Sequence, residues 1–189
     1  MQPPRVIDTR IVYENRWMRL HEDRTERADG TPGLYAWIEK PPAAVIVPLD
    51  GDHVWLIEQH RHPVGARFWE FPQGAWEDDP AAAPEELARG ELAEETGLRA
   101  GRLEHLGSLF FAYGISDQPF DVWRATELEA GEQALETTEA DLRVARVTVD
   151  ELEAMIAGGR VRDAASVAAW HLATRTMPAR RPDRRARDG

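Results

Sequence analysis

One short stretch of the chain restricts the possible folds more than any other. Residues 43–49 read AAVIVPL, a continuous apolar run. A strand with both faces buried has this pattern, whereas a strand with one face in water alternates apolar and polar residues. A turn at residues 50–52 follows, and residues 54–59 are expected to return as a hairpin partner. The sequence therefore predicts a central strand that is covered on both faces.

Other predicted elements surround this strand. Strand patterns bounded by turn signals occupy residues 7–13, 17–24, 34–39, 68–71, 103–113, 120–125 and 142–149. Helical patterns occupy residues 85–96, 149–157 and 163–177. This order of strands, helix, strands and helices predicts an α/β fold of the α+β type. We expect a mixed sheet packed between helices, with a small N-terminal antiparallel sheet made by the first three strands.

The chain is expected to have three parts. Residues 1–40 hold the N-terminal strands. Residues 41–177 form the main domain, whose last helix carries Val167, Trp170 and Leu172 at the spacing of one buried face. Residues 178–189 carry five arginines and almost nothing apolar, which predicts a disordered basic tail.

The composition excludes several classes of protein. No apolar run approaches the roughly 18 residues of a membrane-spanning helix, and residues 1–10 lack the apolar core of a secretory signal. The chain has no cysteine, so disulfides and cysteine-based zinc sites are impossible. The net charge of −11 argues against coating a nucleic-acid backbone, which needs clustered Lys and Arg. These features predict a cytoplasmic protein that binds neither membranes nor nucleic acids.

The predicted helix over residues 85–96 carries an unusual set of acids. Glu91, Glu94 and Glu95 stand at positions i, i+3 and i+4, so they share one face of the helix. A solvated acidic face is the ordinary explanation of such a pattern. However, Leu87 and Leu92 supply an apolar face, which indicates that the helix is docked and that its acidic side is held in place.

Divalent metal binding is the alternative explanation of the acidic helix. A loop at Gln73 and Gly74 precedes the helix and offers backbone carbonyls near the same place. Carboxylates and carbonyls are the hard oxygen ligands that Mg²⁺ or Mn²⁺ prefers. No pair of histidines has the helical spacing of a zinc site. The pattern therefore favours magnesium chemistry on a phosphate-containing substrate.

The residues of this stretch resemble a known family. GELAEETGL at residues 90–98, following FPQG at residues 71–74, is similar to the Nudix box of the Nudix hydrolases. The resemblance implies a Nudix-like mixed sheet and an enzyme with two or three Mg²⁺ (or Mn²⁺) ions. It also implies that Glu91, Glu94, Glu95 and Gln73 are the metal ligands.

The chain departs from the family pattern at three points. Gly90 stands at the position of the motif arginine, and the spacing from Gly74 is two residues longer than usual. The first Glu of the motif falls on Ala82, for which Glu77 or Asp78 could substitute. Because glycine weakens a helix by roughly 1 kcal/mol relative to alanine, Gly90 indicates either a close packing contact or relaxed selection. A catalytically weakened protein is the alternative that these departures leave open.

The resemblance extends beyond the box, to the ADP-ribose pyrophosphatase branch of the family. Residues 54–74 and 158–173 are similar to that branch's segment before the box and to its C-terminal helix. The branch resemblance implies that the strands up to Lys40 exchange across a homodimer and help to bind the nucleoside.

Several side chains outside the box are candidates for the site. Arg61 is expected to bind the diphosphate, because guanidinium matches phosphate oxygens, with a surface salt bridge as the alternative. Glu70 is either a further acid near the metals or a buried structural carboxylate. His60 and His62 are expected to face solvent.

The water-activating and base-binding residues are the least determined. The branch resemblance places a glutamate on a loop before a late strand; Glu139 is the candidate, followed by Glu136 and Asp141, and Glu94 is the alternative on the helix. A plain acidic loop is the competing interpretation. The aromatic side chains of the N-terminal strands could stack on the base or pack in the core or a dimer interface; they are Tyr13, Trp17 and Trp37.

The family and branch resemblance implies hydrolysis of the pyrophosphate bond of a nucleoside diphosphate derivative. ADP-ribose, cleaved to AMP and ribose 5-phosphate, is the first candidate substrate. A nucleotide sugar of the GDP-mannose type is the alternative within the same chemistry. A non-catalytic ADP-ribose sensor is the alternative of a different class, and Gly90 and Ala82 are the features that support it.

Overall fold

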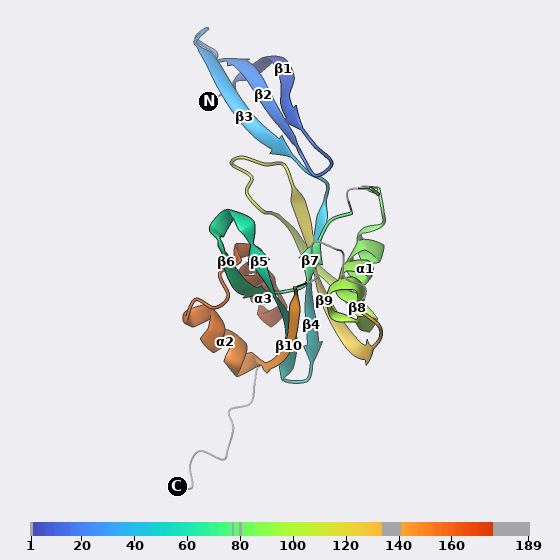
Figure 1. Cartoon of the computed structure of the whole chain (residues 1–189). Coiled ribbons are helices and arrows are strands. Elements are labelled where there is room, and N and C mark those ends of the chain that lie inside the picture. The colour runs from blue at the N-terminus through green and yellow to red at the C-terminus, as the bar shows by residue number, and fades with distance from the viewer. Residues whose placement is uncertain (1, 77, 80, 134–140, 176–189) are drawn as a thin grey trace.

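The computed structural model describes residues 2–76, 78–79, 81–133 and 141–175 (Figure 1). Within this part of the chain two sheets and three α-helices are present. The predicted tail at residues 178–189 lies outside the described residues. No helix of the described ranges is long and apolar enough to cross a membrane.

The predicted N-terminal sheet is confirmed. It is antiparallel and consists of β1 (Arg5–Glu14), β2 (Arg19–Glu26) and β3 (Pro32–Glu39) in that order. This sheet projects from one end of the molecule in Figure 1. Every residue of β1 is exposed, including the neighbours Ile11 and Val12. Because neighbouring side chains of a strand point to opposite faces, neither face of β1 is buried by this chain.

The second sheet is mixed, as the element order predicted. Its main path runs β10-β5-β4-β9-β8; β6 pairs with β5, and β7 with β4. The strands are β4 (Ala43–Asp50), β5 (His53–Arg61), β6 (Ala66–Glu70), β7 (Gln73–Gly74), β8 (Leu98–Phe110), β9 (Pro119–Ala130) and β10 (Arg143–Thr148). The β4–β9 pair is parallel, and the other pairs of this sheet are antiparallel.

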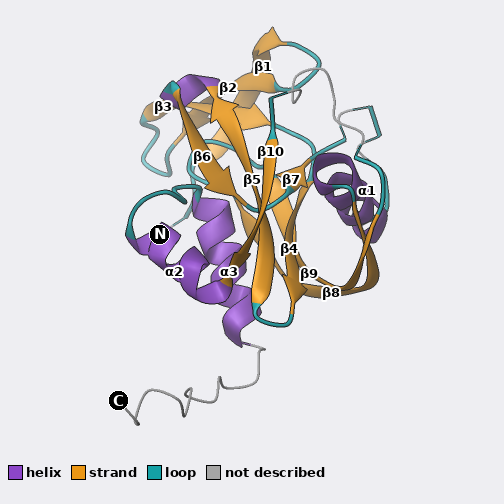
Figure 2. Cartoon of the chain, turned by 60° about the horizontal axis from the view of Figure 1, so that its bottom comes forward, coloured by secondary structure: helices purple, strands orange, loops and turns teal. Residues whose placement is uncertain are grey.

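The central strand β4 divides the interior into two apolar clusters. Its residues Val45 and Val47 pack toward one cluster, with α2 (Val149–Ala157) and α3 (Ala164–Arg175). Ala44 and Ile46 pack toward the other, with α1 (Pro84–Thr96). Figure 2 shows α1 on one side of the sheet and α2 and α3 on the other. The prediction of a strand buried on both faces is therefore confirmed.

Local sequence explains where the helices begin and end. Pro84 occupies the first turn of α1, where its missing N–H costs nothing, and Gly97 ends the helix with a φ of 71°. Thr148 and Glu151 form a reciprocal capping box at the start of α2. Asp163 precedes α3 and accepts the backbone N–H of Ser166 at 2.7 Å. These ends fix the helices relative to the strands on which the site is built.

One predicted helix face was partly wrong. Val167 was expected to be buried, but it is 38% exposed. Trp170 is buried as expected and Leu172 is partly buried. Small side chains take the remaining buried positions of α3; they are Ala165, Ser166, Ala169 and Ala173. Small residues let a helix approach the sheet closely. A prediction based on apolar residues alone therefore placed Val167 in the buried face.

Candidate active site

A pocket of about 920 Å³ lies between the acidic side of α1 and the start of α3. Side chains of opposite charge line it. The carboxylates are Glu70, Glu91, Glu94 and Asp163, and the bases are Lys40, Arg61 and Arg162. Trp17 and Trp76 add two indole rings to the wall. This mixture suits a ligand that carries negative charge and an aromatic group, provided that cations offset the acids.

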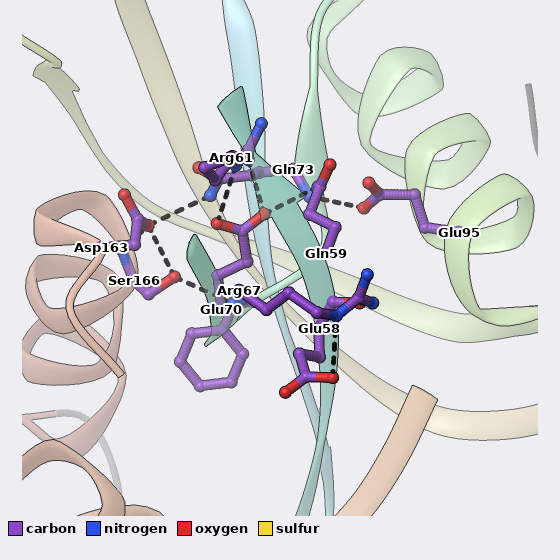
Figure 3. Close-up of polar contacts among 10 residues, drawn as sticks. Glu58, Gln59, Arg61, Arg67, Glu70, Gln73, Glu95, Asp163 and Ser166 are labelled. Carbon is purple, nitrogen blue, oxygen red and sulfur yellow. Dashed lines mark hydrogen bonds and ion pairs between the residues drawn. The ribbon is translucent and has the colours of Figure 1, made fainter. Parts of the chain in front are cut away.

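The acids of α1 are not a solvated face. Glu95 has no exposed surface and Glu91 is 6% exposed, while Glu94 is half-buried and lines the pocket. One oxygen of the Glu95 carboxylate, Oε2, accepts the backbone N–H of Gln73 at 2.8 Å (Figure 3). Burial of charged groups needs specific partners. The ordinary explanation of an acidic helix surface is therefore wrong for Glu91 and Glu95.

Gly74 allows the loop to approach this helix. A Cβ atom at residue 74 would lie 2.3 Å from Oε2 of Glu91, well inside van der Waals contact. A side chain at residue 74 would require the Glu91 carboxylate, which is the flexible end of that side chain, to move away. The backbone at Gln73 and Gly74 is thus held against Glu91 and Glu95, as the sequence predicted for this loop.

Helix α3 holds the same loop from the other side. The Gln73 side chain donates from Nε2 to Oδ2 of Asp163 at 3.1 Å, and the Ser166 hydroxyl donates to the same oxygen at 2.7 Å. The Ser166 hydroxyl also accepts the backbone N–H of Phe71 at 2.9 Å (Figure 3). Sequence reasoning assigned no role to Asp163 or Ser166. The Asp that precedes a helix was a readable capping signal, but its bond to Gln73 was not.

Arg61 and Glu70 form a pair at the pocket wall. The Arg61 guanidinium donates from Nη2 to Oε1 of Glu70 at 2.5 Å and from Nε to Oε2 at 3.2 Å. Gln59 adds a third bond at 2.8 Å. Glu70 is 2% exposed; its burial raises the pKa of the carboxyl, and Arg61 opposes that rise. The Arg61 side chain is 42% exposed, so the pair has one buried and one accessible member.

The structure separates the two candidate tryptophans. Trp17 is half-exposed and lines the pocket, in a turn where the Asn15 side chain accepts the Trp17 N–H at 2.9 Å. Trp37 does not line this pocket. It stacks on His21, with ring centroids 4.2 Å apart, and donates its indole N–H to Asp23 at 3.0 Å.

The remaining candidates lie away from the pocket or outside the described residues. Glu136 and Glu139 belong to residues 134–140, which the structure does not describe. Asp141 pairs with Arg67 of β6. His60 and His62 are exposed, as expected, and so is Tyr13 of β1.

Comparison with known proteins decides the family. Residues 39–170 match the NUDIX domain model, and residues 5–38 match the model of the nucleoside diphosphate sugar hydrolase N-terminal domain. The chain belongs to the Nudix family.

Individual relatives agree with this assignment. An ADP-ribose pyrophosphatase of Mycobacterium tuberculosis is 32% identical over 182 residues, which cover 93% of this chain and 87% of that protein. An ADP-ribose pyrophosphatase of Bacillus subtilis is 26% identical over 155 residues, covering 81% and 83%. A solved structure of an ADP compounds hydrolase superposes with a TM-score of 0.81 at 23% identity, covering 93% of this chain and 94% of that one. The predicted fold class and the prediction of a Nudix hydrolase are confirmed.

The Nudix residues fit a divalent cation by chemistry. Nudix hydrolases generally use divalent metal ions such as Mg²⁺. Three carboxylates on one face of α1 and the backbone of the loop at Gly74 offer hard oxygen donors. In the part of the chain that the structure describes, however, no three Asp, Glu or His side chains converge as a metal cluster. At Glu95 one carboxylate oxygen instead accepts the Gln73 N–H.

The departures from the Nudix motif have separate structural outcomes. Asp78, one of the two residues that could substitute for the missing first Glu from the enlarged loop, is 92% exposed and lies 3.5 Å from Arg16 of the N-terminal turn. Glu77 lies outside the described residues, and Ala82 is partly buried. Gly90 has the close packing contact that the sequence suggested: a Cβ there would lie 2.1 Å from Cζ2 of Trp76.

Proposed function

We propose that this Nudix hydrolase cleaves the pyrophosphate bond of ADP-ribose and releases AMP and ribose 5-phosphate. The observation that carries the proposal is a pocket that combines the Nudix carboxylates, Arg61 and Trp17. The relatives named ADP-ribose pyrophosphatase, which align over most of the chain, support this choice of substrate.

The Nudix helix and the loop would hold the metal ions. Glu91, Glu94, Glu95 and the backbone carbonyl of Gln73 are the proposed ligands for two or three Mg²⁺ (or Mn²⁺) ions. When bound there, such ions would supply positive charge that neutralises the developing negative charge, and would lower the pKa of the attacking water. The bonds from Gln73 to Glu95 and to Asp163 support the proposal, because they fix the loop between α1 and α3.

Arg61 is the proposed cation for the diphosphate. A guanidinium has five N–H donors, and the two hydrogen bonds to Glu70 engage Nε and Nη2. The paired guanidinium is therefore oriented by Glu70 and still has donors for a phosphate oxygen. Glu70 acts here as a positioning residue and not as a metal ligand.

Water activation is assigned to Glu139, with Glu94 as the alternative. The family resemblance places such a glutamate before a late strand, and the segment before β10 fits this position. A general base acts in the transition state, so Glu139→Gln should lower kcat and leave KM nearly unchanged.

A second copy of the chain is the proposed partner of the N-terminal sheet. Large apolar side chains of β1 are exposed on both faces; they are Val6, Ile7, Ile11, Val12 and Tyr13. Neither face of β1 is buried, and a small sheet with so little burial is marginal by itself, so we infer a homodimer that covers it. In that dimer Trp17 would bind the base from the pocket wall. Trp37 would support the sheet through its stack on His21.

One experiment tests the substrate. The purified enzyme is incubated with Mg²⁺ and with ADP-ribose or GDP-mannose in parallel, and the released mononucleotide and sugar phosphate are quantified. ADP-ribose should be cleaved with the higher kcat/KM. The match of residues 5–38 to a nucleoside diphosphate sugar hydrolase domain favours nucleotide sugars as the second candidate, and faster cleavage of GDP-mannose would select it. Binding of ADP-ribose without cleavage would instead show a sensor.

A further inference from the structure

We propose that Trp76 is a positioning residue that sets how closely the catalytic helix approaches its loop, and that Gly90 is glycine in order to admit the Trp76 ring. The proposal rests on the proposed function only in that Glu91 and Glu94 are taken as metal ligands. The established Nudix assignment does not include it, because Gly90 replaces the motif arginine and the loop is enlarged in this chain.

The contact at Gly90 is unusually close. A Cβ at this position would lie 2.1 Å from Cζ2, 2.8 Å from Cη2 and 3.2 Å from Cε2 of the Trp76 indole. The Trp76 indole is a rigid ring with two side-chain torsions, so it cannot bend to avoid a Cβ atom at residue 90. Gly90 stands inside α1, where glycine is the weakest helix former apart from proline. The chain therefore keeps a poor helix residue where any larger one would displace the ring.

The Trp76 ring also packs against the apolar core. Trp76 is partly buried and packs against the apolar cluster that contains Ile46, Ala88 and Leu92. Its neighbour Ala75 packs against the opposite cluster, with α2 and α3. The loop is thus anchored in both halves of the core at two successive residues. The indole can move off Gly90 only by giving up its packing against the cluster.

Two adjacent contacts join the loop to the helix. Gly74 admits the carboxylate of Glu91, and Gly90 admits the ring of Trp76. The helix residues of these contacts, 90 and 91, are neighbours, and the loop residues, 74 and 76, are two positions apart. The rigid ring at Gly90 limits how closely α1 approaches the loop, and the Glu91 carboxylate packs beside it at Gly74. Trp76 lines the pocket together with Glu91 and Glu94. A shift of the ring would therefore change the positions of these two carboxylates in the pocket.

The contact also bears on whether the site is degenerate. Gly90 could have been explained by relaxed selection in a protein that no longer catalyses. A glycine required by a packed ring is under a steric constraint instead. Loss of the motif arginine is therefore accompanied by a different, apolar means of holding the helix to the loop.

A double-mutant cycle tests the contact without substrate. Urea unfolding midpoints are compared for the wild type, Gly90→Ala, Trp76→Leu and the double variant. In the wild-type background Gly90→Ala should lower the midpoint because of the clash. In the Trp76→Leu background the same substitution should leave it unchanged or raise it, because alanine is the better helix former. An equal effect in both backgrounds overturns the contact. If Gly90→Ala alone does not fold, a folded double variant supports the contact and an unfolded one overturns it.

A second measurement separates positioning from mere packing. Calorimetry with Mg²⁺ alone, and kcat with ADP-ribose, are compared for Trp76→Leu and Trp55→Leu. Trp55 is the matched control, because it is also partly buried against the same cluster but does not line the pocket. Misplacement of reacting groups by about 1 Å can cost roughly a hundredfold in rate. Trp76→Leu should weaken Mg²⁺ binding and lower kcat by about tenfold to a hundredfold, while Trp55→Leu changes neither.

The positioning role of Trp76 and the proposed function can fail separately. Unchanged Mg²⁺ binding and kcat in Trp76→Leu would overturn the positioning role, even if the stability cycle shows coupling. If the wild type cleaves no ADP-ribose, the proposed function fails, but the cycle and the Mg²⁺ calorimetry still decide the role of Trp76.

Discussion

Glu95 offers the sharpest test of the metal site. Replacement by Gln preserves the shape of the side chain and an oxygen that can accept the Gln73 N–H, now 2.8 Å from Oε2. It removes the charge that a divalent cation requires. We expect turnover to fall at least about a hundredfold, which corresponds to about 2.7 kcal/mol of lost transition-state stabilisation.

The same substitution should have little effect on the metal-free protein. A hydrogen bond to a charged group contributes about 1.5–3 kcal/mol, against about 1 kcal/mol for a neutral one. Its loss is opposed by removal of a fully buried charge and of repulsion from Glu91 and Glu94. We therefore expect the free energy of unfolding to change by less than about 1 kcal/mol without metal. With Mg²⁺ at ten times its Kd the wild type should gain about 1.4 kcal/mol, and the variant should not.

The assays are kcat from AMP release and urea unfolding with and without Mg²⁺. Glu86→Gln is the matched control, because Glu86 is an exposed acid in the first turn of the same helix and does not line the pocket. Near-normal turnover of Glu95→Gln, or equal stabilisation of both variants by Mg²⁺, would refute the assignment of Glu95 as a ligand.

Five further outcomes are expected. Arg61→Ala should lower the free energy of unfolding by about 1–3 kcal/mol, because it leaves the buried Glu70 without its cation. Since burial already raises the pKa of Glu70, the loss of stability measured by urea unfolding should be larger at pH 8 than at pH 5. An equal loss at the two pH values would contradict this. Glu139→Gln should lower kcat by about 10²–10⁴-fold with unchanged Mg²⁺ affinity, and full activity would move the base elsewhere. Thr148→Ala should cost about 1 kcal/mol of stability through loss of the α2 cap. The backbone N–H of Thr148 lowers the pKa of Glu151 below its ordinary 4.5. The stability difference between wild type and Glu151→Gln should therefore be present at neutral pH and disappear as the pH falls through this lowered pKa. Light scattering at micromolar concentration should show a dimer, and a monomer would refute the shared N-terminal sheet.

The parts of the site that could be predicted from sequence depend on short-range geometry. The spacing of Glu91, Glu94 and Glu95 places them on one helix face whatever the rest of the chain does. Their burial could not be predicted in this way, because it depends on contacts made by other segments. The bond between Gln73 and Asp163 joins residues ninety positions apart. Nothing in the local sequence of either residue indicates the other.

Side-chain partners were the other limit. From the sequence, Trp17 and Trp37 were equally good candidates for stacking on a base. In the structure Trp17 lines the pocket, whereas Trp37 stacks on His21. Gly90 could be identified as unusual from helix propensity alone. The reason for it lies in the Trp76 ring, which an enlarged loop brings over the helix. Sequence patterns thus located the anomaly, and only three-dimensional contacts explained it.

The parallel pairing of β4 with β9 has a consequence for how the chain folds as it is synthesised. Residues 43–48 find their partner only at residues 120–125, and the loop at Gln73 is completed only by Asp163. Until those segments leave the ribosome, the apolar strand β4 lacks its parallel neighbour and one of its helical covers. Long-range pairing of this kind slows folding, because the entropy of closing a long loop is lost before the non-local contacts form. Nascent chains that end before α3 should therefore be protease-sensitive at β4, and catalytic competence should arise only once α3 has emerged.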